Sequence, residues 1–128
     1  LAQSLMEAVG IIVWVDDEND IDTVTAVSGS GPAYFFLFME AMQDAAKELG
    51  LPEDLAKQLV YQTASGAADL AIQSKDSTAE LRRKVTSPGG TTERAIKKFE
   101  AGEIRKLVNS ALVEAKTRSI ELSKELKS

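Results

Sequence analysis

"LAKQLVYQTASGAADLAIQS", residues 55–74, carries apolar residues on more than one side when it is wound as a helix. Steps of three and four residues divide these apolar residues into two sets, each on its own face of the helix. The first set is Leu55, Leu59, Ala64, Ala67, Leu70 and Ala71, with Thr63 at its edge, and the second is Tyr61, Ala68 and Ile72. A helix that is apolar on two faces buries both of them. In a chain of 128 residues this favours a second subunit as the partner of one face.

Apolar residues recur at helical spacing along most of the remaining chain. Gly50 and Gly102 are suited to end helices, and Pro52 is suited to the first turn of the next one. Ser77 followed by Glu80 has the spacing of a capping box at a helix start. We therefore expect an all-α helical bundle, with helices over residues 1–9, 17–27, 32–49, 53–74, 77–85, 91–101 and 103–126.

One segment near the N-terminus departs from the helical pattern. "IIVWV", residues 11–15, is β-branched and aromatic, and it is the only strand that we expect. A lone strand leaves its backbone hydrogen-bonding groups unpaired, so it needs a neighbouring sheet. The sequence also begins with Leu1 rather than methionine. We therefore expect residues 1–16 to belong to a sheet that is completed by a separate domain or by another chain, and residues 17–128 to be the helical domain.

The composition excludes several classes of site. A net charge of −5 argues against a general nucleic-acid surface, and the longest apolar run is too short to cross a bilayer. Cysteine and histidine are both absent, which removes disulfides, cysteine-based zinc sites and Ser-His-Asp triads. The acidic run at 16–20 is interpreted as a solvated loop rather than a cation site. We expect no metal, nucleic-acid or membrane partner and a cytoplasmic location.

The remaining chemistry must come from hydroxyls, carboxylates, lysines, backbone N–H groups or a bound cofactor. "VTSPGGTTERAI", residues 85–96, is the strongest candidate. Gly89 and Gly90 let a ligand approach the backbone, and the helix that follows offers free N–H groups and a positive dipole end to a carboxylate or phosphate. Thr91 and Thr92 add hydroxyls at the same end, where the carboxylate of Glu93 would oppose an anion. The alternative is a tight turn followed by a helix cap.

Two stretches together resemble one enzyme family. "AVSGSGPAYFFLFMEAM", residues 26–42, and "LRRKVTSPGGTTERAI", residues 81–96, resemble the pyrroline-5-carboxylate reductases, and the likeness runs from about residue 22 to near the C-terminus. Without the resemblance, the Gly-rich part of the first stretch is only a helix break or a place of close helix packing.

The resemblance implies a fold and an activity. Members of this family have an N-terminal Rossmann domain that binds NADPH or NADH and a helical C-terminal domain that dimerises. The chain is similar to the second domain, and "IIVWV" would then be the last strand of the first. The implied activity is NAD(P)H-dependent reduction of 1-pyrroline-5-carboxylate to L-proline in proline biosynthesis, by a homodimer or a higher homo-oligomer. This chain alone is then expected to be an inactive piece of the enzyme.

The resemblance also implies roles for residues of the loop. The catalytic residue is Thr92, whose hydroxyl faces the substrate nitrogen. The substrate-binding residues are Ser87, Gly89, Gly90, Thr91, Thr92 and Glu93, which shape the loop and hold the substrate carboxylate through backbone N–H groups. Some relatives carry asparagine at the position of Lys84, where it lies near the cofactor, so no cofactor contact is assigned to this lysine.

Two other interpretations remain. The chain could be a dimerisation or adaptor module without enzymatic activity, or it could belong to another imine or hydroxy-acid reductase. The sequence upstream of Leu1 distinguishes them, because a strand followed by G-x-G-x-x-G/A and a helix would indicate a nucleotide-binding domain.

Overall fold

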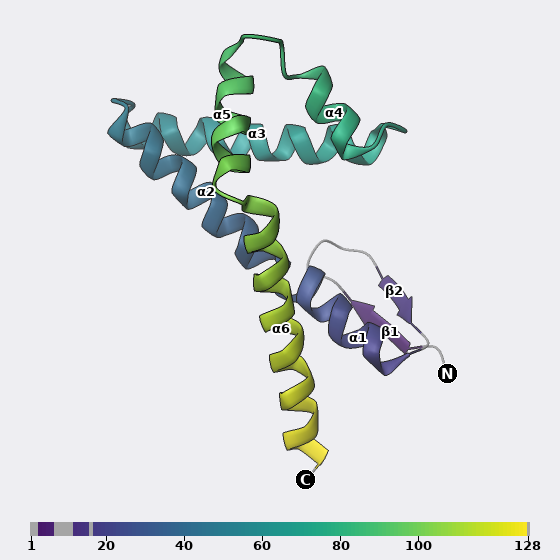
Figure 1. Ribbon diagram of the computed structural model, residues 1–128. Coiled ribbons are helices and arrows are strands. Elements are labelled where there is room, and N and C mark those ends of the chain that lie inside the picture. Colours follow the sequence, from purple (N-terminus) through teal and green to yellow (C-terminus); the bar gives the residue numbers. More distant parts are fainter. Residues whose placement is uncertain (1–2, 7–11, 16, 128) are drawn as a thin grey trace. The chain divides into compact units, whose positions relative to one another are not determined.

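The computed structural model describes residues 3–6, 12–15 and 17–127. Two compact units divide the chain. The first contains the N-terminal region up to Phe36 together with the segment from Ile104 onward, and the second runs from Leu37 to Glu103. The elements, in chain order, are β1 (Gln3–Met6), β2 (Ile12–Val15), α1 (Glu18–Val24), the π-helical turn η1 (Thr25–Gly29), α2 (Gly31–Glu48), α3 (Glu53–Gln73), α4 (Thr78–Lys84), α5 (Thr91–Ala101) and α6 (Ile104–Lys127) (Figure 1). The expected all-α domain is confirmed.

The two strands pair with each other as an antiparallel hairpin, with Gln3 opposite Val15 and Met6 opposite Ile12. The predicted strand is therefore confirmed at β2, but the helix predicted over residues 1–9 is wrong at Gln3–Met6. The rest of that helix lies outside the described residues. β2 is also not alone, because β1 supplies partners for its backbone groups. An isolated two-stranded hairpin is only marginally stable in water, so this pairing does not remove the need for further support.

In the first unit, α1 and η1 pack against α6. The hydroxyl of Ser119 on α6 donates a hydrogen bond to a carboxylate oxygen of Asp22 on α1 at 2.7 Å. α1 begins at Glu18, so Asp22 lies inside the helix and is not its N-cap. Asp22 instead connects two helices that are distant in the sequence.

The predicted break at residues 28–32 takes the form of a π-helical turn followed by a bend. The N–H of Ser30 donates to the carbonyl of Thr25, five residues back, at 2.8 Å. The hydroxyl of Tyr34 reaches back to the carbonyl of Ala26 at 2.7 Å. These bonds satisfy backbone groups that a continuous α-helix would have paired differently.

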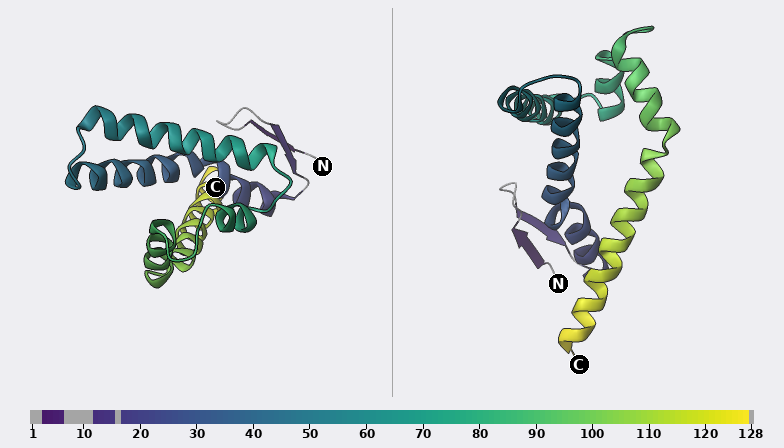
Figure 2. Two further views of the ribbon diagram at one scale, coloured as in Figure 1. Left: turned by 90° about the horizontal axis from the view of Figure 1, so that it is seen from above. Right: turned by 90° about the vertical axis from the view of Figure 1, so that its left-hand side faces the viewer.

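In the second unit, α2 and α3 form a helical hairpin (Figure 2). Gly50 has a φ of +110°, a conformation that glycine adopts without the steric penalty of a side chain. Its N–H donates to the carbonyl of Lys47, and the N–H of Leu51 donates to that of Ala46, each at 3.0 Å. This is a Schellman motif, so the helix end predicted at Gly50 is confirmed together with its mechanism.

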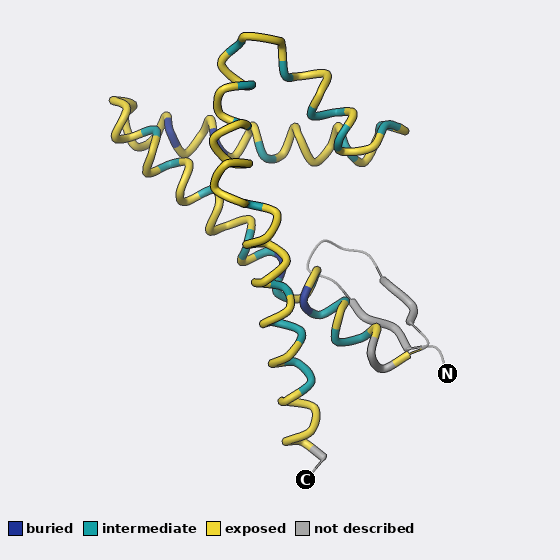
Figure 3. The backbone as a smooth tube through the Cα atoms, in the orientation of Figure 1, coloured by how far each residue is buried: buried dark blue, intermediate teal, exposed yellow. Residues whose placement is uncertain are grey.

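The buried side of α3 differs from the expected one. Its buried residues are Ala56 and Val60, and Ala64 and Ala71 are half-buried (Figure 3). The leucines of the predicted stripe, Leu55, Leu59 and Leu70, remain exposed. The chain itself therefore covers Ala56 and Val60 of α3 and leaves Leu55, Leu59 and Leu70 exposed.

Candidate active site

The predicted loop begins with a tight turn at Ser87–Gly90. The N–H of Gly90 donates to the carbonyl of Ser87 at 3.0 Å. Gly89 has a φ of +74°, and Pro88 precedes it. Proline at the second position and positive φ at the third position define a type II turn. The turn thus explains why this sequence needs proline followed by glycine.

The turn leads directly into the N-terminus of α5. Gly90 is the N-cap residue in an extended conformation, and no side chain caps it. Within the described part of the chain, neither the backbone N–H groups nor the hydroxyls of Thr91 and Thr92 have a hydrogen-bond partner. Both threonines are exposed. The helix start therefore offers two N–H donors and two hydroxyls to an anionic ligand, at the positive end of the helix dipole.

The carboxylate of Glu93 also belongs to this loop. One of its oxygens accepts a hydrogen bond from the N–H of Gly89 at 3.2 Å. The same oxygen lies 3.6 Å from the ammonium of Lys97, one helical turn further along α5. On sequence alone Lys97 is interpreted as surface charge, although the i, i+4 spacing of opposite charges is a signal for this pair.

Contacts on both sides hold the loop in place. Before it, the hydroxyl of Thr86 donates to the carbonyl of Arg82 at 2.5 Å, which fastens the chain to the last turn of α4. After it, the ring of Phe99 on α5 lies against that of Phe38 on α2, with centroids 6.0 Å apart. The loop is therefore tied to α4 before it and, through Phe99, to α2 after it.

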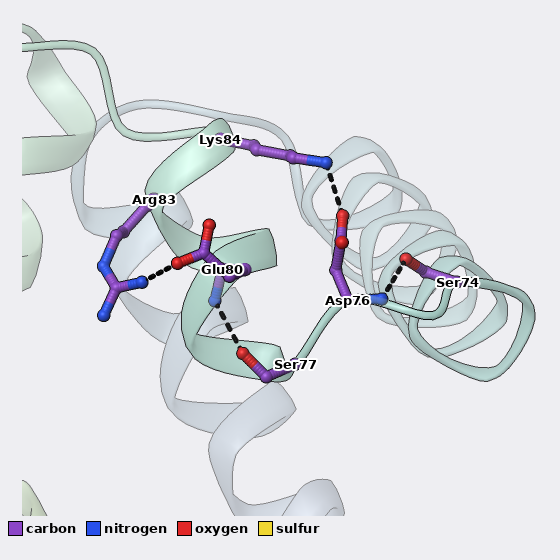
Figure 4. A network of polar contacts seen from close by, with 6 residues as sticks. All are labelled: Ser74, Asp76, Ser77, Glu80, Arg83 and Lys84. Carbon is purple, nitrogen blue, oxygen red and sulfur yellow. Dashed lines mark hydrogen bonds and ion pairs between the residues drawn. The ribbon is translucent and has the colours of Figure 1, made fainter.

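The helix that precedes the loop, α4, begins at the predicted cap. The hydroxyl of Ser77 accepts a hydrogen bond from the N–H of Glu80 at 3.1 Å (Figure 4). The carboxylate of Glu80 pairs with Arg83 instead of returning to the backbone of Ser77. The cap is thus confirmed, but only one half of the capping box forms.

Lys84 ends α4, and its ammonium pairs with Asp76 in the connection between α3 and α4 (Figure 4). The hydrogen bond to Asp76 and the negative charge of that carboxylate raise the pKa of Lys84 above its usual value. Lys84 therefore links the C-terminal end of α4 to the connection that precedes its N-terminal end, and the carboxylate of Asp76 balances its charge.

Many large apolar residues of the described part of the chain are exposed. The buried hydrophobic residues of the described part are Ala26, Ala56 and Val60 only. In the second unit, Leu70 is 52% exposed and Ile72 is 81% exposed. Leu70 and Ile72 lie on different faces of α3, so this helix exposes apolar residues on both of its apolar faces. No helix in the described part is long and apolar enough to cross a membrane.

A family model described as pyrroline-5-carboxylate reductase dimerisation matches residues 18–122. The chain belongs to this family. It is 58% identical over 125 residues to a pyrroline-5-carboxylate reductase of Pseudomonas aeruginosa, covering 98% of this chain and 46% of that protein. It is 46% identical over 123 residues to the pyrroline-5-carboxylate reductase of Pasteurella multocida, covering 95% of this chain and 45% of that protein. The chain thus spans about half the length of these pyrroline-5-carboxylate reductases.

Solved structures of pyrroline-5-carboxylate reductases agree with this assignment. The enzyme of Coxiella burnetii superposes with a TM-score of 0.86 at 51% identity, over 90% of this chain and 43% of that one. The Plasmodium falciparum enzyme, solved with NADP bound, superposes with a TM-score of 0.78 at 36% identity, over 81% of this chain and 40% of that one. The helical fold described here is therefore that of the pyrroline-5-carboxylate reductase dimerisation domain.

The predicted site residues of this family member are nearly consecutive in the sequence, and the structure divides them between a turn and a helix start. Ser87, Gly89 and Gly90 form the turn, and Thr91, Thr92 and Glu93 form the first turn of α5. Within the part of the chain that the structure describes, no group of acidic residues is arranged to hold a metal ion. The roles of these residues toward a substrate stay predictions.

Gly89→Ala should destabilise the fold by about 1–2 kcal/mol. Gly89 has a positive φ, and a residue with a side chain is less stable by about that amount in the left-handed region. Gly102→Ala is the matched control. Gly102 has a φ of −81°, and a methyl group there would meet only ordinary contacts, so its loss should stay below about 0.5 kcal/mol. Urea unfolding of both variants measures the difference, and equal losses would contradict the assigned turn.

Proposed function

We propose that the chain is the dimerisation and substrate-binding domain of a pyrroline-5-carboxylate reductase, which converts 1-pyrroline-5-carboxylate to L-proline with NADPH or NADH in proline biosynthesis. The proposal rests on one observation: the glycine turn leads directly into the N-terminus of α5, which no side chain caps. Family membership and 58% identity to a protein of that name support the same function. A cytoplasmic location stays a prediction.

The loop has the groups that this substrate requires. The substrate carries a carboxylate, and the free N–H groups of Thr91 and Thr92 point to the binding of one. The N–H groups of Gly89 and Gly90 are already engaged by Glu93 and Ser87. We propose that the carboxylate binds the two threonine N–H groups and that the turn fixes their direction.

Thr92 is proposed to hydrogen-bond the ring nitrogen of the substrate. During reduction the C=N carbon gains a hydride and the nitrogen keeps or gains a proton, so a positioned hydroxyl beside the nitrogen orients the bond that reacts. A threonine hydroxyl is a poor acid in water, which favours positioning over proton donation, with water as the proton source.

A nicotinamide cofactor supplies the hydride in this chemistry. The described residues do not fit such a cofactor by themselves, because the Gly-rich loop at residues 87–90 follows a helix and not the strand that a dinucleotide fingerprint requires. We propose that a nucleotide-binding domain outside residues 17–128 holds it and that residues 1–16 are the end of that domain.

The partner that covers the exposed apolar surface is proposed to be a second copy of the chain. The matched family is described by its dimerisation, and the exposed leucines of α3 supply a suitable face. Assembly beyond the dimer is compatible with the same surface. An adaptor module without activity would also account for these leucines, but it would leave the free donors of the loop unexplained.

The isolated chain should not bind NADPH with micromolar affinity, because its described residues include no dinucleotide-binding unit. Calorimetric titration of NADPH into the chain measures this directly. The same chain joined to a Rossmann domain of a relative should bind NADPH and reduce 1-pyrroline-5-carboxylate. Micromolar binding of NADPH by the isolated chain would contradict the proposal that a separate domain holds the cofactor. A fusion that binds NADPH but has no reductase activity would contradict the proposed function.

A further inference from the structure

Glu93 occupies an unusual place for an acidic residue in a loop that binds a carboxylate. It is the third residue of α5, where the side chain of a capping box would reach back to the N-cap N–H. That N–H, of Gly90, is already bonded to Ser87. Glu93 instead accepts from the preceding N–H, that of Gly89 at 3.2 Å. The carboxylate therefore fixes the residue of the turn that has positive φ.

The same carboxylate carries a negative charge beside the proposed anion site. It lies on the residue that follows Thr92, in the same helical turn as the free N–H groups. An unbalanced negative charge in this helical turn would repel a substrate carboxylate. Lys97 supplies the balance, because its ammonium lies 3.6 Å from the oxygen that accepts from Gly89.

The two side chains of this ion pair differ in their exposure to solvent. The side chain of Glu93 is 34% exposed, whereas that of Lys97 is 76% exposed. An exposed ion pair contributes little to folding stability. Replacement of Lys97 should therefore change the folding stability little. Its effect on the charge of the loop should be measured through the affinity for an anionic ligand.

We propose that Glu93 and Lys97 form a positioning pair, in which Glu93 holds the N–H of Gly89 and Lys97 cancels its charge so that the loop accepts the substrate carboxylate. This inference rests on the proposed function, because it concerns the same loop. Glu93 and Lys97 are positioning residues and are not proposed to touch the reacting atoms.

A double-mutant cycle in the complete reductase tests the charge balance. Lys97→Met should raise KM for 1-pyrroline-5-carboxylate about three- to tenfold and leave kcat within about twofold. Glu93→Gln keeps the acceptor oxygen and removes the charge that opposes the substrate carboxylate, so it should lower KM for 1-pyrroline-5-carboxylate. The double variant should return KM to within about twofold of the unmodified enzyme. KM for NADPH should change by less than about twofold throughout.

Lys98→Met is the matched control, because Lys98 carries the same charge one position along α5 and is not paired with Glu93. It should change KM by less than about twofold. An equal rise of KM in Lys97→Met and Lys98→Met would show a general charge effect and overturn the proposal. A rise in Lys97→Met that Glu93→Gln fails to reverse would overturn it as well.

Amide hydrogen exchange at Gly89 tests the positioning without any turnover. Exchange should be about tenfold faster in Glu93→Ala than in Glu93→Gln, because only glutamine retains an acceptor. Equal exchange rates would overturn the positioning role of Glu93. A complete, unmodified enzyme that includes the nucleotide-binding domain, folds and dimerises but shows no reductase activity would refute the proposed function. The exchange comparison would still decide whether Glu93 holds Gly89.

Discussion

Leu70→Asp should leave a monomer or an unfolded chain, whereas the unmodified chain is expected to be a dimer. Leu70 lies on α3 with half of its surface uncovered, on the same helix as the exposed Leu55 and Leu59. A standard interface buries about 1,600 Å² in total, and an intertwined pair of helices would bury more. A partnerless carboxylate buried in such an interface costs several kcal/mol, which is comparable with the whole stability of a small domain.

Light scattering coupled to size exclusion measures the outcome, with a single chain at 13.8 kDa and a dimer at twice that mass. Gln58→Asp is the control, since it introduces the same side chain at an exposed polar position of α3. It should keep the dimer. A Leu70→Asp variant that remains a folded dimer by light scattering and circular dichroism would count against the proposed interface.

The other large effect is expected at Thr92, where replacement by alanine should lower kcat/KM at least about tenfold. Removal of one preorganised donor from an oxyanion hole costs about 2.7–4 kcal/mol, or a hundredfold or more in turnover. A hydroxyl that mainly positions the ring nitrogen contributes less, which sets the lower expectation. Thr92 is exposed and forms no hydrogen bond within the described residues. The melting temperature and the affinity for NADPH should therefore change little.

The boundaries at Gly50 and Ser77 could be predicted because they depend on local signals. Gly50 ends α2 through its positive φ, and Ser77 starts α4 through a hydrogen bond to a residue three positions away. Each signal is written within about six residues of sequence. The same is true of the turn at residues 87–90, where proline followed by glycine selects its type.

The features that depend on distant partners were predicted less well. Gln3–Met6 has the apolar spacing of a short helix, but pairing with β2 decides its conformation. Asp22 has the residue type of a helix cap, yet it binds Ser119 from the other end of the chain. On α3 the sequence indicates two apolar faces, but it does not indicate which face the chain covers itself.

The candidate site was predicted as a segment and not as a set of contacts. The motif placed Ser87 to Glu93 in one loop, which the structure shows as a turn and a helix start. The use of Glu93 as an acceptor for Gly89, and its pairing with Lys97, depend on side-chain directions that the motif does not specify. Lys84 likewise required the structure, because its partner Asp76 lies eight residues earlier.

Steady-state kinetics of Thr92→Ala, Thr92→Val and Thr92→Ser in the complete reductase test the central claim most directly. Serine keeps the hydroxyl, so Thr92→Ser should retain most of kcat/KM for 1-pyrroline-5-carboxylate. Alanine and valine remove the hydroxyl, and valine keeps the shape, so both should lose at least about tenfold with an unchanged melting temperature. Near-normal kcat/KM in Thr92→Ala or Thr92→Val, or a loss of activity that follows unfolding, would show that the loop is only a turn and the start of a helix.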